Sequence, residues 1–308
     1  METNNNLTFA IIKALAFFDM YDYALAFDEL YHYVGVKCDM KELRVALNAE
    51  KKYWSEKNGY YFLSGREMLV DGMREFTANA ENKFRIAKMT ASILKYLPGV
   101  RMMAVCNSLA RGVAGEKSDI DFFIILKKGR IWTLRLMITL IVHLLGVRRH
   151  AQKITDRICL SFYVTDDHLD IYEFEDQDLD YFWLSTMKPL YDDGAYREFI
   201  GSNKWLYAVQ PNFSLRRMKS FAWQGDSLPS AAFKKIFGLL LFSPLGTLFE
   251  NIARKAQLVR IRSHKDSLYW QEGKQVVVSD SVLKFHEKDD REEYRQRLRD
   301  KIVKLLNG

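Results

Sequence analysis

The stretch from Val105 to Leu126, VCNSLARGVAGEKSDIDFFIIL, places the strongest constraint on what this 308-residue chain can fold into. An apolar run from Met102 to Cys106 is typical of a short buried strand, and Phe122 to Leu126 is typical of a second one. Between them, Asn107 and Ser108 indicate a sharp turn, and the residues that follow suit the start of a short helix. This order predicts a small α/β unit.

Two acids, Asp119 and Asp121, open the second apolar run. Because side chains alternate along a strand, both carboxylates should point to one face while Ile120 points to the other. Hard divalent ions such as Mg²⁺ or Mn²⁺ prefer oxygen ligands, and proteins often hold them with two carboxylates plus the phosphates of a substrate. The pattern therefore predicts a metal site that a nucleotide completes.

The combined pattern resembles the signature of the nucleotidyltransferase superfamily that includes DNA polymerase beta. The matching residues are Asn107, Ser108, Asp119, Ile120, Asp121 and Phe122, and Ala110-Arg111-Gly112 resembles the usual filler. The chain departs from the family where Asn107 replaces the usual Gly. Asn tolerates a positive φ, so we expect the turn to persist. The wider order of features resembles bacterial predicted nucleotidyltransferases of about this length with a winged-helix-like N-terminus.

The resemblance implies Mg²⁺- or Mn²⁺-dependent transfer of a nucleoside monophosphate from an NTP to an acceptor hydroxyl, with release of pyrophosphate. Asp119 and Asp121 would be the catalytic metal ligands. Asn107 and Ser108, at the turn, would bind the nucleotide. Arg111 is a candidate phosphate contact, with a surface salt bridge as the equal alternative. The acceptor is not defined by the sequence.

Active members of the superfamily generally carry a third carboxylate on a neighbouring strand. Here the next apolar run, Ile158 to Val164, contains no acid, and the expected position falls near Ser161. Asp156, just before that run, is therefore our candidate for the third catalytic acid.

Residues 1–65 have the pattern of a winged-helix-like module. Apolar spacing predicts a first helix from Leu7 to Phe18 and a second from Phe27 to Val34. Asp39 and Glu42 form a capping box for a third helix, and aromatic residues on both sides of Asn58-Gly59 predict a hairpin. The third helix offers basic residues to nucleic acid, but its acids favour a protein-docking role.

Three further segments complete the predicted organisation. Residues 66–98 should form a linking helix, residues 99–175 the mixed-sheet nucleotidyltransferase core, and residues 176–308 a mainly helical C-terminal region. The apolar stretch from Ile236 to Phe249 contains Pro244 and is short for a membrane span, so we expect a buried or surface-docking helix there. Contact with one face of a membrane is the alternative that stays open.

The composition is that of an ordinary globular protein, with 48% hydrophobic residues and a net charge of +7 that mildly favours anionic partners. Cys38, Cys106 and Cys159 are widely spaced and odd in number, so they indicate neither a disulfide framework nor a zinc site. No signal peptide pattern begins the chain. We therefore expect a cytoplasmic enzyme without a transmembrane segment. Two alternatives are a winged-helix nucleic-acid-binding regulator and a catalytically inactive nucleotide-binding scaffold.

Overall fold

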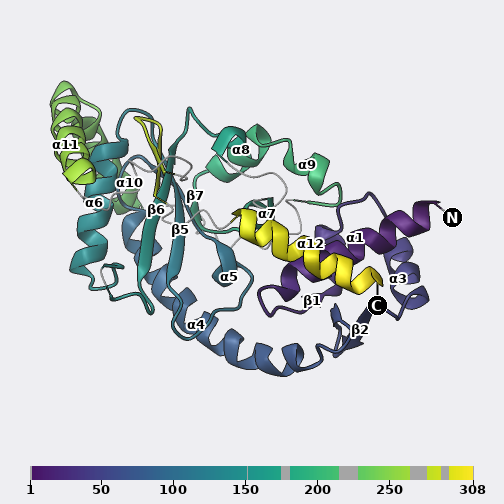
Figure 1. Ribbon diagram of the computed structural model, residues 1–308. Coiled ribbons are helices and arrows are strands. Elements are labelled where there is room, and N and C mark those ends of the chain that lie inside the picture. Colours follow the sequence, from purple (N-terminus) through teal and green to yellow (C-terminus); the bar gives the residue numbers. More distant parts are fainter. Residues whose placement is uncertain are drawn as a thin grey trace.

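The computed structural model describes residues 2–150, 152–174, 181–214, 228–263, 276–285 and 291–307 (Figure 1). The N-terminal elements are α1 (Glu2–Asp19), β1 (Leu25–Ala26), α2 (Phe27–Tyr33), α3 (Met40–Ala49), β2 (Trp54–Lys57) and β3 (Tyr60–Leu63), followed by the long helix α4 (Met68–Leu94). The central elements are β4 (Val100–Val105), α5 (Asn107–Ala110), β5 (Ile120–Leu126), α6 (Ile131–Leu144) and β6 (Ile158–Thr165).

The remaining elements follow a short 3-10 turn at Tyr172–Phe174. They are α7 (Tyr181–Thr186), β7 (Lys188–Asp192), α8 (Ala195–Ser202), α9 (Leu206–Val209), α10 (Leu228–Leu241), α11 (Pro244–Ser263), β8 (Val276–Val278), β9 (Val282–Phe285) and α12 (Arg291–Asn307).

The N-terminal segment has the helices and the hairpin that the sequence predicts. The Asp39 side chain accepts hydrogen bonds from the Lys41 and Glu42 amides, and Glu42 accepts one from the Asp39 amide, so the capping box is confirmed. Asn58 and Gly59 both have positive φ, as a tight hairpin turn between β2 and β3 requires. β1 pairs with β3 to complete a three-stranded sheet. The winged-helix assignment of this segment stays a prediction.

The core of the chain is a mixed six-stranded sheet in the order β7-β4-β5-β6-β9-β8. β5 and β6 are parallel and are connected through α6, while the other neighbouring pairs are antiparallel. This confirms the predicted α/β fold class with a mixed sheet. β5 lies in the interior of the sheet, between β4 and β6, so the acids at its start are flanked by a strand on each side.

Side chains alternate between two buried clusters, one on each face of the sheet. On β5, Phe122 and Ile124 join the cluster that packs against α4 and α6. Phe123 and Ile125 join the cluster that reaches α7, α8 and the N-terminal helices. Asp119 and Asp121 share the parity of Phe123, and therefore belong to this second face.

The sheet extends beyond the segment that the sequence assigned to it. β7 adds an edge strand beside β4, and the hairpin of β8 and β9 extends the sheet beyond β6. The sequence did not predict the place of Val276–Val278 in the central sheet. The predicted boundary between residues 175 and 176 lies outside the described residues.

The N-terminal segment shares a core with the central domain. Phe17 of α1 stacks on Phe182 of α7 with ring centroids 3.6 Å apart. The C-terminal helix α12 packs beside α1, where Lys301 and Arg66 both pair with Asp19 (Figure 1). The predicted boundary at residue 65 is thus crossed by aromatic stacking and by a shared ion pair.

Candidate active site and metal centre

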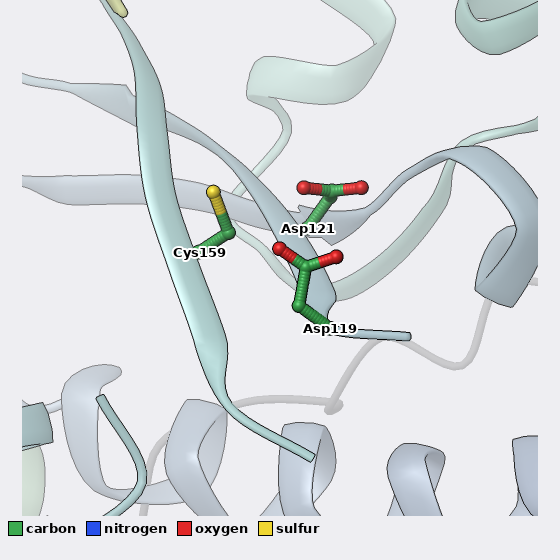
Figure 2. A group of neighbouring side chains, drawn as sticks. All are labelled: Asp119, Asp121 and Cys159. Carbon is green, nitrogen blue, oxygen red and sulfur yellow. The ribbon is translucent and has the colours of Figure 1, made fainter. Parts of the chain in front are cut away.

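Asp119 and Asp121 lie at the start of β5 with their carboxylates on the same side of the strand, as Figure 2 shows. Ile120, between them, is fully buried on the other face. The backbone alternation that the sequence predicted is therefore present.

The third member of the group is Cys159, the second residue of β6. In the parallel pairing of β5 and β6, Cys159 is the register partner of Asp121, so its side chain leaves the sheet on the same face. Its side chain lies beside the two Asp side chains (Figure 2). One ligand atom from each of Asp119, Asp121 and Cys159 lies within 4.8 Å of the others. Sequence reasoning missed Cys159, although it has the same strand parity as Ser161, the position that we had singled out.

The structure does not bring Asp156 into this group. Asp156 lies in the turn before β6 with φ of 56°, and its carboxylate accepts a hydrogen bond from Lys83 Nζ at 2.5 Å. Lys83 is almost fully buried and also donates to the carbonyl oxygens of Glu116 and Ser118, at 3.1 and 2.9 Å. Asp156 therefore belongs to a hydrogen-bond network, centred on Lys83, that holds the loop before Asp119 in place.

Asn107 directly contacts the acidic pair. It has φ of 56°, which confirms that Asn supports the turn where the family usually has Gly. From this position its Nδ2 donates to Asp121 Oδ2 at 2.8 Å. The Cys106 amide donates to the Asp121 carbonyl at 3.1 Å, so the turn is fixed to β5 by backbone and side chain. Ser108 follows on the same turn and is partly exposed.

Arg149 supplies a cation at the site from the loop between α6 and β6. Its Nη1 donates to Asp119 Oδ2 at 2.6 Å and lies 3.7 Å from Cys159 Sγ. The Arg149 amide donates to the Ile158 carbonyl at 3.0 Å, so the loop runs beside the first residue of β6. Arg149 belongs to a basic cluster formed by Arg148, Arg149, His150 and Lys153. The structure places one member of that cluster against the acidic pair.

Burial at the site disfavours the ionised forms of Asp121 and Cys159. Burial raises the pKa of Asp121, and the nearby charge of Asp119 raises it further, while the hydrogen bond from Asn107 acts in the opposite direction. Burial also raises the pKa of the Cys159 thiol, to about 12, and the charge of Asp121 contributes. A divalent cation would reverse both effects, because it favours the ionised form of each ligand.

Two carboxylates and one thiol at this spacing suit a single divalent ion. The carboxylates are hard ligands of the kind that Mg²⁺ and Mn²⁺ prefer, whereas a thiolate is a soft ligand that favours zinc-like ions. The donor set therefore fits a divalent metal, with a softer third ligand than the superfamily usually provides.

Arg111 is placed differently from Asn107 and Ser108. Its guanidinium lies over the rings of Phe18, Tyr21 and Tyr23, at 5.7, 5.4 and 5.8 Å from their centroids. Burial among these groups lowers its pKa. Arg111 thus links the central domain to the N-terminal segment, and a phosphate contact by this residue stays a prediction.

A mixed sheet with a strand, a turn-and-helix step and a second strand that begins with two same-face acids defines a nucleotidyltransferase type of domain. Residues 88–203 match the family model described as "Nucleotidyltransferase domain", and this part of the chain belongs to the nucleotidyltransferase superfamily. The matched range extends from within α4 to the end of α8 and so includes β7. Searches of curated proteins and of solved structures found no match.

Proposed function

We propose that the chain is a Mg²⁺- or Mn²⁺-dependent enzyme that transfers a nucleoside monophosphate from an NTP to an acceptor hydroxyl and releases pyrophosphate. The observation that carries this proposal is the convergence of Asp119 and Asp121 on one face of β5, with a third ligand on β6. A bound divalent ion would neutralise the triphosphate and acidify the acceptor hydroxyl.

The residues around the pair have distinct roles in this proposal. Asp119 and Asp121 hold the metal, and Asn107 orients Asp121 through its hydrogen bond. Ser108 contacts the triphosphate from the same turn. Arg149 neutralises Asp119 before the nucleotide binds. When the nucleotide is bound, the Arg149 guanidinium donates hydrogen bonds to the phosphate oxygens instead.

The acceptor proton must go to a base near the reacting oxygen. Among the three side chains of the group, Cys159 is a poor base for this role when it is a neutral thiol, because its pKa is raised to about 12. We therefore assign the proton to Asp119 or Asp121. Asp156 acts from a distance in this scheme, through Lys83 and the loop at Glu116–Ser118. The thiol in the site also fits the reducing cytoplasm that we propose as its compartment.

The test is incubation of the full chain with α-labelled NTPs, Mg²⁺ or Mn²⁺, and candidate acceptors that include the protein itself. Pyrophosphate release and a nucleotide mass increment on an acceptor are expected, and Asp121→Asn should abolish both. Unchanged turnover in Asp121→Asn, with the fold intact, would place the chemistry elsewhere.

A catalytically inactive nucleotide-binding protein is the second candidate. The observations that favour it are the thiol at the third ligand position and the direct pairing of Arg149 with Asp119. Both features would lower the affinity of the site for a hard ion such as Mg²⁺. Tight NTP binding without pyrophosphate release, in either metal, would select this function over the first.

A further inference from the structure

The helices α10 and α11 form a bent helix pair beyond α6, at one end of the molecule (Figure 1). Their outer surface is strongly apolar. Ile236, Leu239 and Leu240 on α10, and Leu248, Phe249 and Ile252 on α11, are each between 53% and 71% exposed. The bent helix pair thus carries an apolar face that the described part of the chain leaves uncovered.

The bent helix pair is attached to α6 by the opposite face of α11. Glu250 accepts hydrogen bonds from the Trp132 and Thr133 amides, both at 2.9 Å, at the start of α6. Gln257 accepts one from Arg135 at 2.6 Å and donates one to the Trp132 carbonyl at 2.7 Å. Because these residues are spaced by about one or two turns, they form one stripe on α11, and the apolar residues form another. The outward orientation of the apolar face is therefore fixed.

The bend between the two helices is also built into the backbone. A Cβ at Gly246 would lie 1.8 Å from the Leu241 carbonyl oxygen, so only glycine fits at this close approach. Among the described residues, no single helix is long and apolar enough to cross a membrane. The required length and hydropathy are reached only when residues 231–241 and 244–263 are taken together, and these two helices are bent by 74° relative to each other.

The charges on the bent helix pair are almost all positive. Between residues 231 and 263 the basic residues are Lys234, Lys235, Arg254, Lys255, Arg260 and Arg262. The one acid in this range, Glu250, is buried against α6. Lys235, Lys255 and Arg262 are exposed at helical positions beside the apolar stripes. An exposed apolar face bordered by cations is complementary to an anionic lipid bilayer, which has an apolar interior and negatively charged headgroups.

We propose that α10 and α11 are a docking surface for an anionic lipid bilayer, on which the chain rests without crossing it. Leu239, Leu240, Leu248 and Phe249 enter the boundary between headgroups and acyl chains, and Lys255 and Arg262 contact lipid phosphates. A second copy of the chain is a poorer fit, because a twofold contact through the same face would bring the two sets of cations together. This inference does not depend on the proposed nucleotidyl transfer.

The test is flotation of the full chain with vesicles of phosphatidylcholine alone and of phosphatidylcholine mixed with phosphatidylglycerol in equal parts. Flotation with the mixed vesicles, and its loss at high salt, is expected. The double variant Leu248→Asn/Phe249→Asn should fall to the level seen with neutral vesicles. The matched control Val45→Asn/Val303→Asn, at exposed apolar positions on α3 and α12, should float like the parent chain.

A second pair of variants tests the charges separately from the apolar face. Lys255→Glu/Arg262→Glu should lose flotation, whereas Lys41→Glu/Lys51→Glu, which changes the net charge equally on exposed α3 and its C-terminal end, should keep it. Circular dichroism and light scattering accompany each measurement. Absence of flotation by the folded parent chain overturns the proposal. If the chain is then a dimer that Leu248→Asn/Phe249→Asn converts to a monomer, a second copy covers this face instead.

Discussion

Cys159 lies opposite Asp121 in the parallel register of β5 and β6, and its sulfur completes a group with the Asp119 and Asp121 carboxylates. Strand pairing thus places a thiol, rather than a third carboxylate, beside the two acids. A thiolate is a soft ligand, so the group would offer a metal two hard ligands and one soft ligand.

Replacement of Cys159 by Asp should supply a hard third ligand. We expect Cys159→Asp to bind Mg²⁺ about tenfold more tightly than the parent chain, equivalent to about 1.4 kcal/mol. Calorimetric titration with Mg²⁺ in the presence of a non-hydrolysable NTP measures the change. Turnover with Mg²⁺, if present, should rise in the same variant.

Cys159→Ser is the matched control, because serine keeps the size of the side chain but removes the soft ligand. The parent chain loaded with Co²⁺ should show a sulfur-to-cobalt absorption band that Cys159→Ser lacks. Equal Mg²⁺ affinities in the three proteins, with no cobalt–sulfur band, would remove Cys159 from the metal site.

The acidic pair should govern metal-dependent NTP binding. Asp119→Asn and Asp121→Asn keep the shape of each side chain but remove one negative ligand. We expect each to weaken Mg²⁺–NTP binding by at least the roughly 10- to 100-fold typical of losing an outer-shell partner. Calorimetry on folded variants checks this, and unchanged affinity in both would show that the metal binds elsewhere.

Much of the core was accessible from the sequence because its signals are local. The turn at Asn107, the alternation of Asp119 and Asp121 and the capping box at Asp39 each depend on residues that are close along the chain. Their geometry in the structure agrees with what those short patterns predict.

The features that the sequence did not reveal depend on long-range pairing. Cys159 lies beside Asp121 because of the register in which β6 pairs with β5, and the sequence of neither strand specifies that register alone. Pro189 lies in β7, an edge strand, where a missing amide donor is tolerated. The place of the β8–β9 hairpin beside β6 likewise depends on a pairing across more than a hundred residues.

Arg149 should affect metal and nucleotide in opposite directions. In Arg149→Ala the cation beside Asp119 is lost, so Mg²⁺ binding alone should be unchanged or tighter. NTP binding should weaken by about tenfold, because a phosphate contact of about 1.4 kcal/mol is removed. Arg148→Ala, in the same loop, is the control and should leave NTP affinity near that of the parent. Parallel loss of metal and NTP affinity in Arg149→Ala would contradict this role.

Asp156 should contribute more to stability than to metal binding. In Asp156→Asn the buried ammonium of Lys83 loses its charged partner but keeps two carbonyl oxygens. We expect the free energy of unfolding to fall by about 2 kcal/mol, as for a hydrogen bond to a charged group. Urea denaturation measures this. Loss of metal affinity with full stability would instead make Asp156 the third ligand that the sequence suggested.

Asp166, at the end of β6, should make stability depend on acid pH. Burial alone would raise the pKa of its carboxyl. Hydrogen bonds from the Lys128 amide and from the side chains of Lys127 and Arg101 outweigh burial and hold the pKa below the ordinary value of 3.8. The unfolded chain therefore binds a proton at higher pH than the folded chain does. The stabilisation is complete above the ordinary value and is lost as pH falls through the lower, folded pKa.

We expect Asp166→Asn to reduce the free energy of unfolding by about 2 kcal/mol at neutral pH. The difference from the parent chain should shrink when urea denaturation is repeated at about pH 3. A difference that stays constant between the two pH values would show that the ionised carboxylate contributes nothing specific to the fold.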